Sequence, residues 1–241
     1  MISVFLFSPD NAPLTAAPSP DIVHVSCIPY LCGKKLPEKG KFPGGGKKVL
    51  VSFPFISRGK AYSLFCGRFK EFASSFDGFT LQNPGDHETL CELLASNPSV
   101  KREELFIAGD AALNVSNNAT ARFWQGRLDS AAILPELSDE EQLELADRFP
   151  DGLLPEIITP ANKIVMRSEH CFAVKGKTFH CGQCGRYGLE GGSLFDINGK
   201  KFPVVTNPID CNSVLLVPGS SQAFGPAEFS PYPERLILRV F

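Results

Sequence analysis

Hydrophobic residues in the first half of the chain fall into short continuous runs rather than into an alternating pattern. Runs such as Ile22-Val-His-Val, Val49-Leu-Val-Ser-Phe and Leu105-Phe-Ile-Ala are typical of strands that are covered on both faces, as in a parallel sheet. The pattern predicts strands at about residues 2–8, 22–28, 49–55, 76–82, 105–113 and 130–136.

Helical segments are predicted between these strands. Residues 59–75 place apolar side chains at helical spacing, and three later segments begin with the capping residues Asp86, Asn117 and Ser138. Strand and helix therefore alternate, which predicts βαβ units with right-handed crossovers. An α/β fold, built as a TIM-like barrel or part of one, is the natural architecture.

The pattern changes after about residue 165. Glycine, cysteine and short β-like pieces replace the alternation, and Asn198-Gly199 predicts the turn of a hairpin. The last residues, 236–241, read as a closing strand. We therefore predict a barrel-like α/β domain at 1–165 and a cysteine-rich segment of irregular and β structure at 166–241.

Composition narrows the class of protein. The 241 residues are 43% hydrophobic with a net charge of −2, so a sizeable core is expected and no overall attraction to nucleic acid or membrane. The lysine-rich loop 33–48 is a local exception, and it reads as a solvated loop or as an RNA contact. The apolar start is too short for a signal peptide, and no run is long enough to span a membrane. We expect a cytoplasmic protein.

Four of the eight cysteines cluster in the second half of the chain, at Cys171, Cys181, Cys184 and Cys211. Clustered cysteines in a reducing compartment more often bind metal or do redox chemistry than form disulfides. Four thiolates suit structural zinc or an iron–sulfur cluster, whereas a redox pair needs only Cys181 and Cys184. Some of them could also be small buried apolar groups. Spacing alone leaves zinc and iron–sulfur open.

The motifs around these cysteines resemble the peptidase U-32 family, the collagenase-like group. The matching blocks come in family order, and the last three are the most specific. They are Phe53-Pro-Phe-Ile-Ser-Arg58, Ala108-Gly-Asp110-Ala-Ala-Leu-Asn114, Leu134-Pro-Glu136-Leu, Met166-Arg-Ser-Glu-His170-Cys171, Cys181-Gly-Gln-Cys184 and Phe195-Asp-Ile-Asn-Gly-Lys-Lys-Phe-Pro-Val204 with Cys211.

The resemblance implies a TIM-like barrel with a 4Fe–4S cluster bound by Cys171, Cys181, Cys184 and Cys211, and zinc remains the alternative. The family's opening motifs are not visible here, so the chain looks like a short form. This departure predicts an incomplete or partial barrel, or one that a larger barrel subunit completes.

Three functions follow from the resemblance. The first is oxygen-independent hydroxylation of RNA or of a small aromatic substrate, as in some family members. The second is a collagenase-like peptidase, although the sequence has neither a Gly-x-Ser-x-Gly nor a His-Glu-x-x-His motif. The third is a non-catalytic partner subunit with a structural metal site. Because barrel active sites lie at the carboxyl ends of strands, the candidate catalytic residues are Arg58, Asp110 and Glu136.

Overall fold

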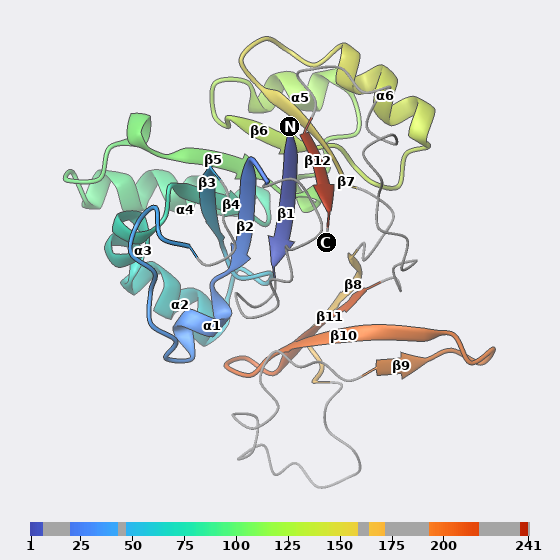
Figure 1. Ribbon diagram of the computed structural model, residues 1–241, viewed down its shortest axis with the longest axis horizontal. Helices are drawn as coiled ribbons and strands as arrows, with labels where there is room; N and C mark the ends of the chain where they lie inside the picture. Colours follow the sequence, from blue (N-terminus) through green and yellow to red (C-terminus); the bar gives the residue numbers. More distant parts are fainter. Residues whose placement is uncertain (7–19, 43–46, 159–163, 172–192, 217–236, 241) are drawn as a thin grey trace, which may run out of the picture.

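The computed structural model describes residues 1–6, 20–42, 47–158, 164–171, 193–216 and 237–240. Its main feature is a closed ring of parallel strands (Figure 1). The ring order is β1, β2, β3, β4, β5, β6, β7 and β12, and β12 pairs with β1. These strands are β1 (Ile2–Leu6), β2 (Ile22–Ser26), β3 (Lys48–Ser52), β4 (Gly78–Leu81), β5 (Phe106–Gly109), β6 (Ser130–Ala132), β7 (Leu154–Ile158) and β12 (Ile237–Val240).

The predicted α/β class and TIM-like curl are confirmed by the six consecutive parallel strands β2 to β7. Strands β1 and β12, from opposite ends of the chain, complete the ring, and Ile2 lies opposite Leu238. Strand β12 is the closing strand predicted at 236–241. The barrel is partial in its helical layer, since no helix occurs among the described residues between β7 and β12.

Helices follow strands β2 to β6. The helices are α1 (Ile28–Leu31), α2 (Gly59–Gly67), α3 (Phe69–Ser75), α4 (Pro84–Ser96), α5 (Asn118–Trp124) and α6 (Asp139–Asp147). Capping boxes mark the starts of α4, α5 and α6. Asn117 and Ser138 cap α5 and α6 as predicted, and each forms a capping box, which the sequence predicted only for Ser138. The helix predicted at 59–75 is broken at Arg68 into α2 and α3. None of the described helices has the length and apolar character to cross a bilayer.

Phenylalanines form the core between the outer face of the barrel and helices α2 and α3. The ring centroids of Phe53 and Phe65 are 4.5 Å apart, and Phe69 stacks on Phe79 at 5.1 Å. All four side chains are at most 1% exposed. Burial of large aromatic side chains is a strong source of stability, so this cluster fixes α2 and α3 against β3 and β4.

A second sheet lies at the carboxyl ends of the barrel strands (Figure 1). It is antiparallel, in the order β8 (Ile164–Ser168), β11 (Asn212–Leu216), β10 (Lys201–Asn207) and β9 (Ser193–Phe195). The predicted hairpin is present, with Gly199 at φ 81° in its turn. The chain leaves the barrel after β7, builds this sheet and returns in β12, and the division into two domains at residue 165 stays a prediction.

Candidate functional site

A cavity of about 390 Å³ opens where β8 meets the carboxyl ends of β5, β6 and β7. Two of the three predicted catalytic residues, Asp110 and Glu136, line it together with Asn114. Strand β8 contributes Ile164, Met166 and Arg167. The cavity lies at the carboxyl ends of the barrel strands, where barrel enzymes have their active sites. We call it the mouth cavity.

Local backbone geometry places Asp110 at the mouth. Strand β5 ends at Gly109, and Asp110 then begins the short 3-10 helix η4 (Ala111–Leu113). A Cβ at position 109 would lie 2.3 Å from Cδ1 of Leu113, so glycine is needed for this tight corner. Asn114 follows with φ 57°, a left-handed conformation that asparagine tolerates. The strand predicted at 105–113 therefore stops early.

The two carboxylates of the mouth cavity lie in different environments. Asp110 is only 2% exposed, whereas Glu136 is exposed in the turn that follows β6. Carboxylates in unlike surroundings suit different tasks. The buried Asp110 can pair with a cationic side chain, whereas the exposed Glu136 can exchange protons with solvent or substrate. Catalysis by either residue stays a prediction.

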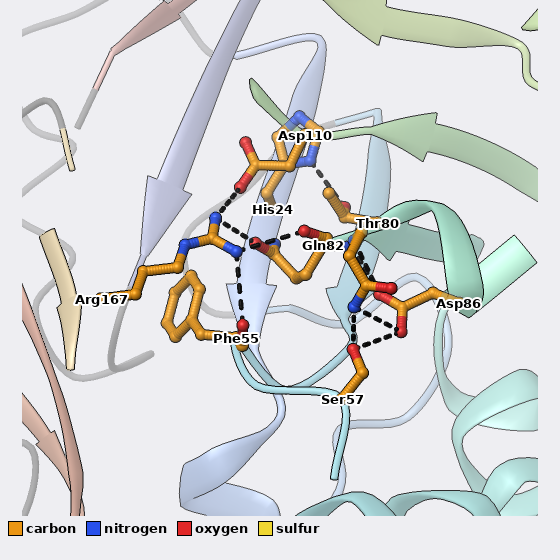
Figure 2. A network of polar contacts seen from close by, with 9 residues as sticks. His24, Phe55, Ser57, Thr80, Gln82, Asp86, Asp110 and Arg167 are labelled. Carbon is orange, nitrogen blue, oxygen red and sulfur yellow. Dashed lines mark hydrogen bonds and ion pairs between the residues drawn. The ribbon is translucent and has the colours of Figure 1, made fainter. Parts of the chain in front are cut away.

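Arg167 of β8 reaches into the barrel mouth and contacts three of its segments (Figure 2). One terminal nitrogen donates to the carbonyl oxygens of Phe55 and Gln82, at 3.3 and 3.1 Å. The other donates to Oε1 of Gln82 at 3.0 Å and to Oδ2 of Asp110 at 3.2 Å. Burial lowers the pKa of the guanidinium, and the Asp110 carboxylate opposes that shift. Arg167 therefore fastens the second sheet to the barrel.

A second polar network stiffens the loops behind Arg167 (Figure 2). The Asp86 carboxylate accepts hydrogen bonds from Ser57 Oγ at 2.6 Å and from the backbone N–H groups of Gln82 and Asn83 at 2.7 and 3.1 Å. Burial raises the pKa of Asp86 despite these donors. The network holds the chain segments after β3 and β4 that carry the acceptors of Arg167.

Tyr62 borders this network, and its ionisation gives a pH-dependent test of it. Burial raises the pKa of Tyr62 from 10.0 to about 12. The folded state thus favours the neutral phenol, so this group's stabilisation is full below pH 10 and lost as the pH rises through about 12. We expect tyrosinate absorbance to show a late step near pH 12 that is missing in Tyr62→Phe. A late step that persists in that variant would show that the raised pKa belongs to another tyrosine.

The sequence did not single out a polar network that lies inside the barrel. His24 of β2 contacts Thr80 of β4 through Nδ1 at 2.8 Å and Glu156 of β7 through Nε2 at 3.2 Å. Ser3 of β1 donates a hydrogen bond to the same glutamate. These strands are not all neighbours in the sheet, so their side chains meet in the lumen.

All four of these side chains are fully buried. The hydroxyls of Ser52 and Ser130 are also buried, and they have no hydrogen-bond partner among the described residues. A lumen this polar is unusual for a barrel of this type, whose interior is normally filled by branched apolar side chains. The sequence signal for these residues was the alternation of inward-facing and outward-facing positions along each strand. It was not recognised because the strands read as continuous apolar runs.

Arg58, the third predicted catalytic residue, lies apart from the mouth cavity. It forms an ion pair with Glu169 and lines a separate pocket of about 270 Å³ together with Gly59 and Asp210. Its side chain is 70% exposed. The structure thus brings Asp110 and Glu136 together but not Arg58, whose catalytic role stays a prediction.

Two of the four predicted metal ligands, Cys171 and Cys211, are described. Ser168 of β8 lies opposite Ser213 of β11, so the residues that follow β8 and precede β11 meet at one end of the sheet. Cys171 and Cys211 belong to these residues, whereas Cys181 and Cys184 lie outside the described residues. Within the described part of the chain, no three His, Cys, Asp or Glu side chains form a metal-binding group.

Comparison with known proteins gives a distant likeness of structure. A U32 peptidase structure matches with a TM-score of 0.45 and 17% sequence identity, over 68% of this chain and 69% of that one. No protein-family model and no curated protein sequence matches the chain. Membership of the peptidase U-32 family therefore stays a prediction from the cysteine motifs.

Proposed function

We propose that this chain is an iron–sulfur protein that binds a small aromatic ring or an RNA base in the mouth cavity and takes part in its oxygen-independent hydroxylation. One observation carries the proposal. The cavity joins Asp110 and Glu136 to β8, and β8 leads within three residues to Cys171. Substrate site and metal centre would thus share one strand, in the reducing cytoplasm that the cysteine usage predicts.

The cysteines fit a metal centre as far as the chain is described. Cys171 and Cys211 come from segments that the antiparallel register brings to the same end of the sheet. Together with Cys181 and Cys184 they would hold a 4Fe–4S cluster, and zinc is the alternative for the same four thiolates. A bound cluster would supply electron transfer or Lewis acidity.

The chain's own residues provide for binding and proton movement. Asn114 and the exposed Glu136 lie at the rim of the mouth cavity, where they can hydrogen-bond to the polar edge of a ring. Leu134, Ile158 and Met166 supply apolar surface for its faces. The Glu136 carboxylate can accept a proton from the ring, whereas Asp110 is engaged by Arg167.

The cavity favours a small ring over a peptide. Its volume of about 390 Å³ lies at the lower end of the range for small-molecule sites. Its described lining contains no serine, threonine, cysteine or histidine to act as the nucleophile or base of a peptidase. The collagenase-like alternative therefore has less support than the hydroxylase.

Anaerobic purification tests the metal centre. We expect about four irons and four sulfides per chain, as a 4Fe–4S centre requires, and loss of that iron in Cys171→Ser and Cys211→Ser. Cys32→Ser and Cys91→Ser are matched controls, because both residues are exposed cysteines in the first half of the chain. These controls should keep the full iron content.

Other results would redirect the proposal. One zinc per chain would favour a non-catalytic partner subunit with a structural metal site. A colourless protein without metal would contradict the proposed cluster. The iron-loaded protein is then incubated anaerobically in isotopically labelled water with an added two-electron acceptor and with RNA or a simple phenol, and mass spectrometry checks for an oxygen atom taken up from the water. No added oxygen in either, with a complete cluster, would leave the non-catalytic partner subunit.

A further inference from the structure

The residues next to Cys171 and Cys211 dock onto the beginning of helix α2. Glu169 lies two positions before Cys171 and pairs with Arg58, the residue that precedes α2. Asp210 lies immediately before Cys211 and contacts the first turn of the same helix. Both cysteine-bearing segments are therefore held by one short stretch of the barrel domain, Arg58 to Ala61.

Asp210 acts as a distant cap of α2. Its Oδ1 accepts a hydrogen bond from the backbone N–H of Lys60 at 2.7 Å, and its Oδ2 accepts one from Ala61 at 2.9 Å. The local N-cap residue, Arg58, makes no side-chain capping bond. A carboxylate that binds the free N–H groups of a first helical turn is stabilised by the hydrogen bonds and by the helix dipole. We call this contact the α2 latch.

Gly59 permits the α2 latch. Its φ of +82° is a left-handed conformation that most side chains disfavour. A Cβ at this position would also lie 2.9 Å from Oδ1 of Asp210 and 3.1 Å from its Cγ. Any larger residue would therefore strain the start of α2 and push the Asp210 carboxylate away from its N–H donors.

The backbone at Cys211 also needs support. Cys211 has φ 55°, which is uncommon for a residue other than glycine, asparagine or aspartate. The preceding turn is fixed by Asn207, whose Oδ1 accepts a hydrogen bond from the Ile209 N–H at 2.9 Å. Such a conformation persists when neighbouring contacts hold it, and the α2 latch at the adjacent residue is such a contact.

Charge gives a second reason for the arrangement. Four thiolates around a metal carry negative charge, and the Glu169 and Asp210 carboxylates adjoin two of them in sequence. Unneutralised carboxylates would raise the energy of a nearby anionic centre. Arg58 neutralises Glu169, and the N-terminus of α2 offsets the charge of Asp210.

We propose that Asp210, Gly59 and Arg58 are positioning residues for the metal centre, and that the α2 latch holds Cys211 in its ligating conformation. The inference rests on the metal centre of the proposed function. Through the α2 latch, retention of the metal depends on the start of a helix in the barrel domain, which lies some 150 residues from Asp210 in sequence.

The test measures how fast the anaerobically loaded full-length protein loses its metal to a coloured chelator. Asp210→Ala and Gly59→Ala are expected to release metal roughly tenfold faster, since losing a helix cap favours the undocked turn by about that factor. Asp210→Asn keeps one acceptor and should lie between alanine and wild type. Arg58→Ala should act in the same direction, but less, because its ion pair is exposed.

The matched control is Ser138→Ala. Ser138 caps α6, which packs against β7 of the barrel, by accepting a hydrogen bond from the Glu141 N–H. It should lower thermal stability to a similar degree while leaving the metal-release rate unchanged. The circular dichroism spectra of all variants show whether each one folds.

The outcomes separate the two proposals. A wild-type chain that binds no metal contradicts the proposed function, whatever the variants do. A wild-type chain that binds metal, with Asp210→Ala and Gly59→Ala releasing it no faster than Ser138→Ala, overturns the α2 latch alone. If Gly59→Ala does not fold, the order Asp210→Ala, Asp210→Asn, wild type decides the question.

Discussion

Replacing Arg167 by alanine is expected to lower the free energy of unfolding by about 3 kcal/mol, the usual range for breaking a buried ion pair. The guanidinium donates to Phe55, Gln82 and Asp110, and the Asp110 side chain is only 3% exposed. The substitution removes the cation from a buried carboxylate and the donor from the backbone carbonyls of Phe55 and Gln82. Urea denaturation measures the effect, and limited proteolysis should show earlier cleavage in the β8–β11 sheet.

Two variants control this experiment. Arg167→Lys keeps a charge but loses the planar fork, so we expect roughly half the effect. Arg148→Ala removes an exposed arginine that pairs with Glu144 within α6, and it should change stability by less than about 0.5 kcal/mol. If Arg167→Ala were as mild as Arg148→Ala, Arg167 would not be what fastens the second sheet to the barrel.

Replacing Glu156 by leucine is expected to destabilise the barrel by about 3 kcal/mol. Glu156 and His24 are 0% exposed, and Ser3 donates to the same carboxylate oxygen. The substitution removes two polar contacts inside the lumen at once. The measurement is again the free energy of unfolding in urea.

A double-mutant cycle shows whether the pair itself matters. His24→Leu should cost a similar amount, because it leaves the Glu156 carboxylate in the lumen without the imidazole. The double variant His24→Leu/Glu156→Leu should be less destabilised than the sum, by at least about 1 kcal/mol. Strict additivity would show that the two side chains contribute independently and that the lumen network has no energetic coupling.

The contacts of Arg167 make β8 the link between the mouth cavity and the proposed metal centre. Its residue Arg167 fastens the sheet to the barrel mouth, and the same strand leads to Glu169 and Cys171. Weakening either attachment should therefore affect the other, because a short strand moves as one unit. Metal release from Arg167→Ala provides that comparison directly.

Local patterns in the sequence were enough to predict most elements of the barrel. Continuous apolar runs predicted β2 to β5, and capping residues Asn117 and Ser138 predicted where α5 and α6 begin, because both signals act over a few neighbouring residues. It also placed Asp110 and Glu136 at strand ends, and these two residues share the mouth cavity. Strand β7 was missed, since Pro155 lacks the N–H that a strand normally donates.

The contacts between distant segments emerge only from the folded arrangement. Closure of the ring by β1 and β12, the pairing of His24 with Glu156, and the grip of Arg167 on Asp110 and Gln82 all join residues far apart in the chain. No local pattern encodes such partners, because each depends on which strands become neighbours and on which side chains then share the lumen or the mouth. Arg58 shows the same limit, since the sequence grouped it with Asp110 and Glu136, whereas its side chain pairs with Glu169 outside the mouth cavity.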